Sequence, residues 1–345
     1  MSLVAAPAIN AKCHAMHSRL LGAGDYDALL RRASVPQIAE YLKNETPYAY
    51  VLRRLSENDA HRGQLESVFK RSLFYDYEKL LRFSGGGCKA AIRAMFEAHE
   101  INDLKLVVGS ICSDHKHLVA ADDLNYVRRY SGFGVDALLM ADTIEGLAEN
   151  LKGTRYHEAL LPFAKKEKPD YLRIDRALDL LAHRAKFAAI SKRLKGSVRE
   201  ACLDAYGQEV DITNIRFIYR MKKLFRYPPA DIVASLIPHR HRLARRDLVD
   251  MAGCDGVDRL VGMVAGTCYK GLFPPGEESA WETIQAEWFY RLHRKNLRNN
   301  VGDANMALSY LRLKEVEIKN IIVILESVRY AIPAQQIRPF LVGSS

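Results

Sequence analysis

Cysteine and histidine side chains come close together at two places in the sequence, where they could act as metal ligands. They are Cys13, His14 and His17 in one group, and Cys112, His115 and His117 in the other. A structural zinc site needs four converging ligands, and neither group has a second half at zinc-finger spacing. We therefore expect surface or core histidines and no metal site.

Nucleotide and hydrolytic chemistry has no stronger basis in the sequence. The run Gly-Gly-Gly-Cys-Lys at residues 85–89 lacks the GxxxxGK[ST] frame of a phosphate loop, and no strand leads into it. No nucleophile elbow or HExxH motif is present. We expect an inter-helix loop at residues 85–89, no cofactor and no small-molecule substrate, so the chain is predicted not to be an enzyme. The alternative is an all-helical enzyme, whose turnover would be abolished by substituting one acidic residue or cysteine.

Basic residues exceed acidic ones and give a net charge of +10 at pH 7. This excess favours an acidic partner: a protein face, an anionic membrane surface or nucleic acid. Two clusters stand out, at residues 239–246 and 291–298, and the second is close to Trp288. Neither matches a nucleic-acid-binding motif, so we expect solvated or protein-docking faces, with a helical-repeat nucleic-acid-binding protein as the alternative. The candidate interface residues are Arg240, Arg242, Arg245, Arg246, Arg294 and Lys295.

A Thr-x-Tyr motif occurs three times at nearly equal intervals. The copies are Thr46 with Tyr48, Thr154 with Tyr156, and Thr267 with Tyr269. Twelve residues before each threonine stands a residue that can cap a helix, followed three residues later by Gln, Glu or Asp, as in a capping box. The three capping candidates are Ser34, Asp142 and Asp255. The tyrosine hydroxyls could meet a ligand, but a tyrosine just past a short capped helix more often packs its ring and hydrogen-bonds locally, and we expect that role.

An asparagine within an apolar helical pattern recurs with the same period of about 110 residues. The three are Asn102, Asn214 and Asn320, each five residues after a glutamate. Because a buried amide needs hydrogen-bond partners, we expect them to be buried contacts between helices. The element Asp-Ala-Leu-Leu also recurs, at residues 27–30 and 136–139, with a looser copy from Asp247. A chain built three times from one unit is more typical of a scaffold than of a catalyst.

Apolar residues recur every three to four positions, and no alternating strand pattern bounded by hairpin turns is present. We predict an all-α protein of three similar helical units, at residues 1–125 with an N-terminal helix, 126–238 and 239–345. Each unit should contain the Asp-Ala-Leu-Leu helix, the short capped helix, a long helix and the asparagine helix. The long helices are expected around residues 65–81, 172–190 and 281–297.

The chain shows no feature of a membrane-spanning or secreted protein. No run approaches the roughly 18 uncharged apolar residues of a membrane span, and no basic start followed by a cleavable apolar block suggests a signal peptide. The six cysteines are scattered without a CxxC pair. This distribution fits free thiols in a reducing cytosol, so we expect a cytoplasmic protein.

The order and spacing of these motifs resemble one family, the C subunits of bacterial and archaeal A/V-type rotary ATPases, kin to the d subunit of the eukaryotic vacuolar ATPase. The likeness covers nearly the whole chain. The matching stretches are Ile9-Asn10-Ala11-Lys12, Ser18-Arg19-Leu20-Leu21 with Asp25-Tyr26, Leu42 with Thr46 and Tyr48, Asn320-Ile321, and Arg329-Tyr330 with Pro333-Ala334-Gln335-Gln336-Ile337. One departure follows Pro238, where a glycine-rich turn is expected and His239-Arg240-His241-Arg242 stands.

The resemblance implies a funnel of three similar helical subdomains around a pseudo-threefold axis. One copy would sit on the membrane rotor ring as a peripheral protein at the cytoplasmic face of the plasma membrane, and its socket would receive the central-stalk coiled coil. Its partners would be the central-stalk rotor subunits and the ring. It would pass rotation between the catalytic head and the ring during hydrogen-ion or other ion transport, with no catalytic residue, metal or cofactor of its own. The basic excess is expected to serve this docking, through acidic loops or anionic lipid headgroups.

Overall fold

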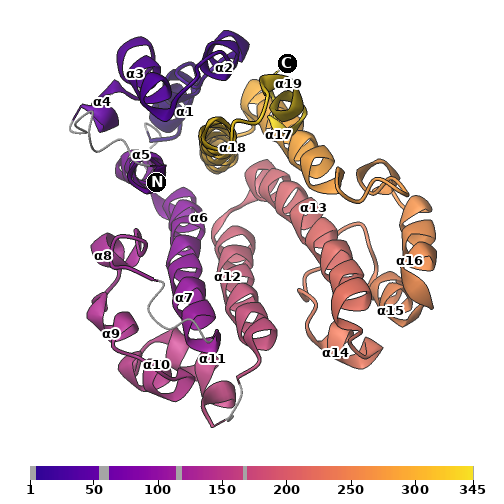
Figure 1. The fold of residues 1–345 in the computed structure, drawn as a ribbon. Coiled ribbons are helices and arrows are strands. Elements are labelled where there is room, and N and C mark those ends of the chain that lie inside the picture. Colours follow the sequence, from indigo (N-terminus) through magenta and orange to yellow (C-terminus); the bar gives the residue numbers. More distant parts are fainter. Residues whose placement is uncertain (1–4, 54–61, 114–118, 166–168, 345) are drawn as a thin grey trace. The chain divides into compact units, whose positions relative to one another are not determined.

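The computed structural model describes residues 5–53, 62–113, 119–165 and 169–344 (Figure 1). Every regular element within these ranges is a helix, and no strand occurs among them. The prediction of an all-α protein is therefore confirmed for this part of the chain.

The chain divides into two compact units. One combines the two ends of the chain, up to Lys89 and from Leu194 onward, and the other is the continuous stretch Ala90–Arg193. In the first unit, residues from the end of the sequence pack with residues from its beginning. The division into three units at residues 125 and 238 stays a prediction.

The order of helix types repeats three times along the described chain. The helices with the Asp-Ala-Leu-Leu element or its looser copy are α2 (Ala23–Leu30), α9 (Asp136–Leu139) and α15 (Arg245–Gly253). The short helices before the Thr-x-Tyr motifs are α3 (Val35–Glu45), α10 (Ile144–Asn150) and α16 (Gly256–Ala265). The predicted long helices are α5 (Arg62–Phe83), α12 (Tyr171–Arg193) and α17 (Trp281–Asn299). The asparagine helices are α7 (Ala98–Cys112), α13 (Gly196–Arg220) and α18 (Asp303–Arg329).

Shorter elements connect these helices. The α-helices among them are α1 (Ala5–His17), α4 (Ala49–Leu52), α6 (Gly86–Phe96), α8 (Val127–Tyr130), α11 (Arg155–Ala164), α14 (Pro229–Ala234) and α19 (Ala334–Ile337). The others are a π-helical turn η2 (Met221–Phe225) and the 3₁₀ turns η3 (Lys270–Leu272) and η4 (Arg338–Phe340). The glycine run that we expected to be an inter-helix loop instead begins α6, because Gly86 can adopt a φ of 50° at the start of that helix.

The predicted helix caps are only partly realised. Ser34 is the N-cap of α3, and its hydroxyl accepts a hydrogen bond from the backbone N–H three residues on, at 3.4 Å. Asp255 is the N-cap of α16, but its side chain makes no capping hydrogen bond. The N-cap of α10 is Thr143, one residue later than Asp142, and its hydroxyl accepts an N–H bond at 3.0 Å. Threonine and aspartate both cap helices well, so two adjacent candidates left the start of α10 ambiguous in the sequence.

The unit Ala90–Arg193 has its own apolar core. Within it, α7 packs against α12 and α9, and α10 packs against α11. The core includes the fully buried side chains Leu104, Val108, Leu138, Leu147 and Leu178. Apolar residues three to four positions apart on α7 and α12 line this core, as the helical periodicity predicts.

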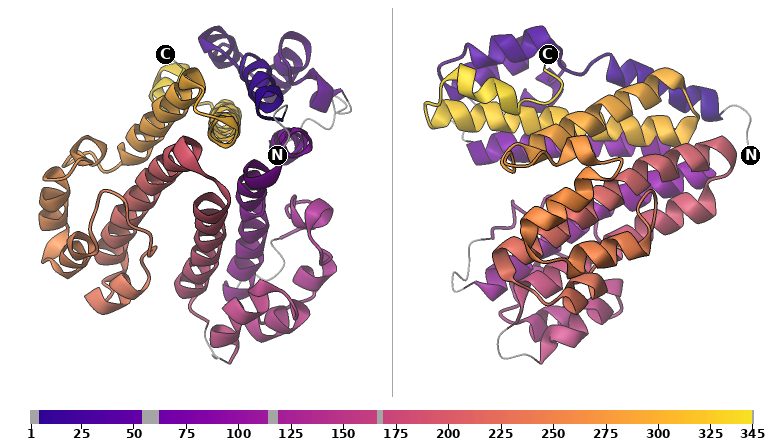
Figure 2. Two further views of the ribbon diagram at one scale, coloured as in Figure 1. Left: turned by 180° about the vertical axis from the view of Figure 1, so that it is seen from behind. Right: turned by 90° about the vertical axis from the view of Figure 1, so that its right-hand side faces the viewer.

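The last asparagine helix, α18, lies at the centre of the unit that combines the two chain ends. It packs against α17 and α13, and also against α1 and α5 from the N-terminal end of the chain (Figure 2). Buried side chains occur on all its faces between Ala304 and Ser327, which is typical of a helix surrounded by others. Helix α18, near the end of the chain, thus completes the core formed by α1 and α5 near its beginning.

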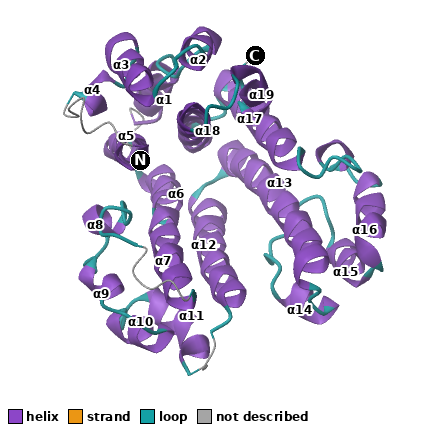
Figure 3. Cartoon of the chain, viewed as in Figure 1, coloured by secondary structure: helices purple, strands orange, loops and turns teal. Residues whose placement is uncertain are grey.

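The asparagine helices α13 and α18, both labelled in Figure 3, end in the same way. After α13 and η2, Arg226 takes a left-handed φ of 50°, and after α18, Ala331 takes a φ of 53°. Pro228 and Pro333 follow as N-caps of α14 and α19. A left-handed residue ends a helix, and proline is well suited to begin the next one. These two turns are marked in the sequence by their prolines.

His293 allows a test of the packing between α17 and α18. Its Nδ1 atom lies 3.2 Å from the hydroxyl oxygen of Ser309. Burial, reinforced by the positive charge of Arg312, lowers the pKa of His293 to about 4, although Glu209 and Glu315 act in the opposite direction. Below its usual pKa of 6.5, His293 binds a proton in the unfolded chain but not in the folded one. The folded state should therefore lose stability as the pH falls from 6.5 towards 4.

Between pH 7 and pH 4.5, we expect the wild type to lose about 2 kcal/mol more stability than a His293→Gln variant. This loss is somewhat smaller than the full pKa shift implies, because the imidazole ring keeps some solvent contact. Urea unfolding followed by tryptophan fluorescence measures this, since Trp281 and Trp288 both lie on α17. Identical pH dependence in the two proteins would show that His293 is not the group responsible.

Candidate functional site

The threonine of each Thr-x-Tyr motif holds the tyrosine at the end of a short helix. Its hydroxyl donates a hydrogen bond to a carbonyl of the preceding turn and accepts one from the tyrosine N–H. The donated bonds run from Thr46 to Leu42 at 2.6 Å, from Thr154 to Leu151 at 2.7 Å and from Thr267 to Val264 at 2.7 Å. The accepted bonds, to Tyr48, Tyr156 and Tyr269, measure 3.3, 3.2 and 3.1 Å. All three tyrosines are buried.

Each tyrosine hydroxyl donates a hydrogen bond to a buried carboxylate on an asparagine helix. The tyrosine–carboxylate pairs are Tyr48 with Glu317 of α18 at 2.7 Å, Tyr269 with Asp211 of α13 at 2.9 Å, and Tyr156 with Glu100 of α7. The partners are 269, 58 and 56 residues apart in the sequence. We expected local hydrogen bonds. The threonine bonds are local, whereas the hydroxyl bonds join distant helices.

The environment of these tyrosines favours a structural role over an acid–base one. Burial, followed by the interaction with the paired carboxylate, raises the pKa of Tyr48, Tyr156 and Tyr269. A phenol with a raised pKa remains a hydrogen-bond donor at neutral pH and gives up its proton reluctantly. The pairs can therefore carry stable buried hydrogen bonds, and they have no proton to transfer in the physiological range.

Each carboxylate also binds a third segment of the chain. Glu317 accepts a bond from the backbone N–H of Leu21, and Glu100 accepts one from the hydroxyl of Ser131. Oδ2 of Asp211 accepts bonds from the consecutive N–H groups of Arg242 and Leu243, at 2.9 and 3.2 Å. One acidic side chain thus connects its own helix, a tyrosine and a loop. Such networks hold helices rigidly when every member has a partner.

One turn after each carboxylate, a second polar side chain binds a loop backbone. Asn214 donates to the carbonyl of Ile237 at 3.1 Å and accepts from its N–H at 2.9 Å. Asn320 makes the same pair of bonds to Val342, at 2.8 and 3.1 Å. Both asparagines are buried, as expected of amides that need partners.

The corresponding residue of α7 is Asp103. It is buried, and its Oδ2 accepts bonds from the N–H groups of Tyr126 and Val127 at 2.8 and 2.9 Å. Asn102, which we predicted for this role, is exposed instead. The signal that could have found Asp103 is its distance of three residues from the paired carboxylate Glu100, which is the same in all three helices.

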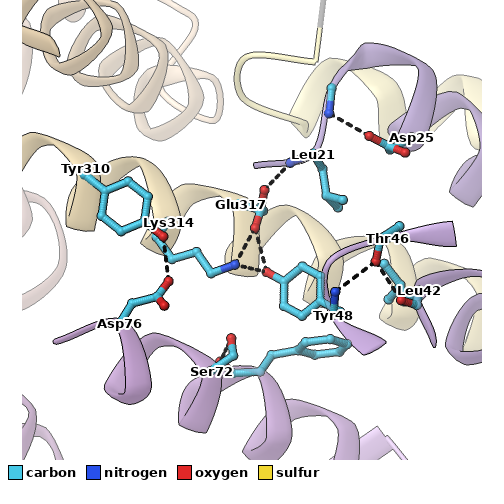
Figure 4. A network of polar contacts seen from close by, with 12 residues as sticks. Leu21, Asp25, Leu42, Thr46, Tyr48, Ser72, Asp76, Tyr310, Lys314 and Glu317 are labelled. Atoms are coloured by element: carbon cyan, nitrogen blue, oxygen red, sulfur yellow. Dashed lines mark hydrogen bonds and ion pairs between the residues drawn. The ribbon is translucent and has the colours of Figure 1, made fainter. Parts of the chain in front are cut away.

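A buried lysine, Lys314 of α18, contacts both members of the Tyr48–Glu317 pair (Figure 4). Lys314 Nζ lies 2.7 Å from Glu317 Oε1, 2.8 Å from the Tyr48 hydroxyl and 4.1 Å from the centre of its ring. One turn earlier on α18, Tyr310 donates to Asp76 Oδ2 of α5 at 2.5 Å. A buried ammonium is stable only with such partners. These contacts tie α18 to the N-terminal part of the chain.

The residues weighed as metal ligands form no metal-binding group among those that the structure describes. Cys13 on α1 is buried, and burial, with a contribution from Asp303, raises the pKa of its thiol to about 12. His115 and His117 lie outside the described residues.

The six candidate interface residues lie in the unit that combines the two chain ends, on the following segments. Arg240 and Arg242 precede α15, Arg245 and Arg246 begin it, and Arg294 and Lys295 are on α17. All except Arg294 are exposed. The His-Arg-His-Arg run is accommodated because α13 has a glycine opposite it: a Cβ atom on Gly207 would come within 2.4 Å of His241 Cγ.

The structure brings Arg242, from the first basic cluster, and Trp288, which lies next to the second cluster in the sequence, to the same stretch of α13. Arg242 Nη2 lies 3.4 Å from Asp204 Oδ1, and Gln208 Nε2 donates to Asp204 Oδ2 at 2.8 Å. On the other side, Trp288 Nε1 of α17 donates to Gln208 Oε1 at 3.2 Å. The sequence placed the clusters about 50 residues apart and gave no sign of this connection.

Among the described residues, none of the helices combines the length and apolar composition needed to traverse a bilayer.

The sequence of residues 9–340 matches the protein family described as "ATP synthase (C/AC39) subunit". The A-type ATP synthase C subunit of Archaeoglobus fulgidus is 24% identical over 333 residues, which cover 95% of this chain and 94% of the relative. The same subunit of Methanothermobacter thermautotrophicus is 23% identical, covering 93% and 83%, and that of Methanosphaera stadtmanae is 22% identical, covering 96% and 86%. The resemblance found in the motifs is thus confirmed over nearly the full length, and the chain belongs to the ATP synthase (C/AC39) subunit family.

Proposed function

We propose that the protein is a non-catalytic central-stalk subunit of an A/V-type ATPase, which couples the rotor shaft to the membrane ring. The family match over residues 9–340 carries this proposal, and the relatives are named as the C subunits of A-type ATP synthases. One copy lies at the cytoplasmic face of the plasma membrane. Its partners are the central-stalk rotor subunits and the ring, and it binds no nucleic acid.

The three tyrosine–carboxylate pairs support a load-bearing role. A protein that transmits torque must resist the sliding of its helices, and tightly packed interiors transmit strain. Each pair connects an asparagine helix, a tyrosine and a third segment through buried hydrogen bonds. Displacing one of these helices requires several buried bonds to break together, and each donor or acceptor left unpaired costs about 1–3 kcal/mol.

The contacts of α18 with the first helices support a closed array of three units. In a closed array the last unit meets the first, so no terminal repeat exposes an apolar face. The unit boundaries at residues 125 and 238 and a funnel with a pseudo-threefold axis belong to this proposal. A central socket in such a funnel would receive the shaft.

Co-purification tests the proposed partners. The tagged chain, expressed in cells that contain the other subunits, should retain both central-stalk and ring subunits. Charge reversal to glutamate at Arg240, Arg242, Arg245 and Arg246 should release at least one of them at physiological salt, because these exposed cations are the predicted docking face. Salt screens interactions between exposed charges, so the difference between this variant and the wild type should be greatest at low salt.

A matched variant controls for charge alone. Glutamates at the four exposed cations Lys192, Arg193, Lys195 and Arg199 change the net charge by the same amount, and this variant should keep the subunits. The rotor proposal fails if the wild type retains neither stalk nor ring subunits. A salt-dependent gel shift on nucleic acid, without subunit binding, would favour the nucleic-acid-binding alternative.

A further inference from the structure

One face of α17 is exposed and basic. Trp288, Arg291, Lys295 and Arg298 are all exposed. The last three follow Trp288 by three, seven and ten residues, so that the four side chains lie on one side of the helix. At 1.5 Å per residue, the row is roughly 15 Å long. No aspartate or glutamate occurs between Trp288 and Arg298. The row therefore presents three cations without an acidic residue among them.

The cations at the far end of this row are free to bind. Neither Lys295 nor Arg298 forms an ion pair with any residue that the structure describes. Arg291 is paired with Glu287 at 3.0 Å. The other oxygen of Glu287 accepts the N–H of Gly343 at 2.9 Å, so both oxygens of this carboxylate are engaged.

The positive charge of α17 also affects the neighbouring helix α1. Burial, followed by the charge of Arg294, lowers the pKa of His17, and Arg298 acts in the same direction. Glu317 opposes them as the smallest contribution. The positive charges of Arg294 and Arg298 are therefore felt at α1.

Trp288 is exposed but held in place. The residue is 39% exposed, whereas the other tryptophan of the chain, Trp281, is 6% exposed. Its Nε1 donates to the buried Gln208 of α13 at 3.2 Å, and Gln208 is fixed in turn by Asp204. An exposed aromatic ring that is already oriented loses little entropy on binding, which is typical of interface anchors.

Asp204 brings a further cation to this site. Its Oδ1 lies 3.4 Å from Arg242 Nη2 and 3.1 Å from His241 Nε2. Arg242 remains half exposed despite this contact. The basic segment before α15 is therefore attached to the same part of α13 as Trp288, although on the other side of Gln208.

A cavity of about 580 Å³ opens beside Trp288. Its lining is mixed: it includes the apolar residues Leu272 of η3, Ile284 of α17 and Leu341 near the C-terminus, together with Trp288 and the charged residues Glu287, Arg291 and Arg338. This volume is within the range of sites that accept bulky apolar groups. A partly apolar cavity thus adjoins one end of the basic row.

We infer that Trp288, Arg291, Lys295, Arg298 and Arg242, here called the Trp288 surface, dock an acidic amphipathic helix of a partner protein. The partner inserts an apolar side chain into the cavity beside Trp288 and places carboxylates one helical turn apart against the basic row. Helix-in-groove recognition of this kind uses anchors at i, i+3 or i+4, and i+7. The inference goes beyond the rotor role: it shares Arg242 with the docking face proposed above and otherwise depends only on this surface.

The geometry favours a protein helix over other anionic partners. A membrane surface needs no cavity and no fixed indole, because lipid headgroups form a fluid layer. Single-stranded nucleic acid stacks on successive aromatic rings, and this face presents one. A straight row of cations ending at a partly apolar cavity matches a helix that has both charges and one bulky side chain.

Acrylamide quenching of the full-length chain tests the inference directly, because Trp288 is the accessible tryptophan. The probe is a tryptophan-free helical peptide of about 18 residues, with glutamates spaced to match the row and leucine at one end. It should protect Trp288 from quenching, and its affinity should fall as salt rises. A peptide with glutamine in place of glutamate should bind at least about tenfold more weakly.

Two charge-reversal variants separate this surface from general attraction. Lys295→Glu with Arg298→Glu should weaken peptide binding by about tenfold or more. The matched variant Lys195→Glu with Arg199→Glu changes two exposed cations elsewhere on the same unit, and it should bind within about twofold of the wild type. Circular dichroism checks the folding of both variants, and Lys295→Gln with Arg298→Gln provides a milder change that should give a smaller loss.

Three results would overturn the inference. One is the absence of any protection of Trp288 by the peptide, and another is equal weakening in the two charge-reversal variants. The third is that phosphatidylglycerol vesicles or a DNA duplex protect Trp288 where the peptide does not, and that this protection is lost in the Lys295/Arg298 charge-reversal variant. That outcome would assign the surface to a membrane or to nucleic acid.

Discussion

Replacing Glu317 by alanine is expected to lower the free energy of unfolding of the unit that combines the chain ends by about 3–5 kcal/mol. The substitution leaves the buried ammonium of Lys314 without its charge partner. It also removes the acceptor of the Tyr48 hydroxyl and of the Leu21 N–H. Breaking a buried ion pair by removing one partner is costly because the remaining charge stays buried.

Urea unfolding followed by tryptophan fluorescence measures this effect, since both tryptophans lie on α17, which packs against α18. Glu282→Ala is a matched control: it breaks the exposed pair of Glu282 with Lys319, at 2.8 Å, and should cost less than about 1 kcal/mol. In a double variant, Lys314→Met with Glu317→Leu, neither charge of this pair remains buried, so part of the loss should be recovered. The rest should persist, because the Tyr48 hydroxyl and the Leu21 N–H still lack their acceptor. A loss for Glu317→Ala no larger than that of the surface control would contradict the assigned role.

Replacing Asp103 by alanine should destabilise the Ala90–Arg193 unit by about 3 kcal/mol, because two buried N–H groups lose a charged acceptor. These are the N–H groups of Tyr126 and Val127. Asn102→Ala, one residue away on the exposed side of α7, should change stability by less than about 0.5 kcal/mol.

Hydrogen exchange on the full-length chain is the sharpest measurement for this pair of variants. Both tryptophans lie outside the Ala90–Arg193 unit, so their fluorescence does not report on it. The amides of Tyr126 and Val127 should exchange faster in Asp103→Ala and stay protected in Asn102→Ala. If Asn102→Ala instead exposes these amides, then the register assigned to α7 is incorrect.

The helical class and the repeated order of helices followed from the sequence with few errors. The apolar spacing around residues 172–190 and 281–297 predicted helices that the structure extends by only a few residues, as α12 and α17. Some helix ends are marked in the sequence by residues of specific chemistry. The prolines at 228 and 333 mark the ends of α13 and α18 because proline cannot continue a helix.

Single positions were less certain where two neighbours could perform the same role. Asp142 and Thr143 can both cap a helix, and Asn102 and Asp103 can both accept hydrogen bonds from a loop. Matching asparagine with asparagine favoured Asn102, whereas the face of α7 that points into the core carries Asp103. A residue type repeated in the sequence is a weaker guide than its position on the helix relative to the buried carboxylate.

The sequence by itself determined the helical class, the triplicated pattern and the family, because these depend on periodicity and on the order of residues along the chain. Only the tertiary structure decided which carboxylate each tyrosine meets and that Trp288 and Arg242 contact neighbouring residues of α13. Helical periodicity specifies which face of a helix is buried. It does not specify which of several similar helices will cover that face, as the distance of 269 residues between Tyr48 and Glu317 illustrates.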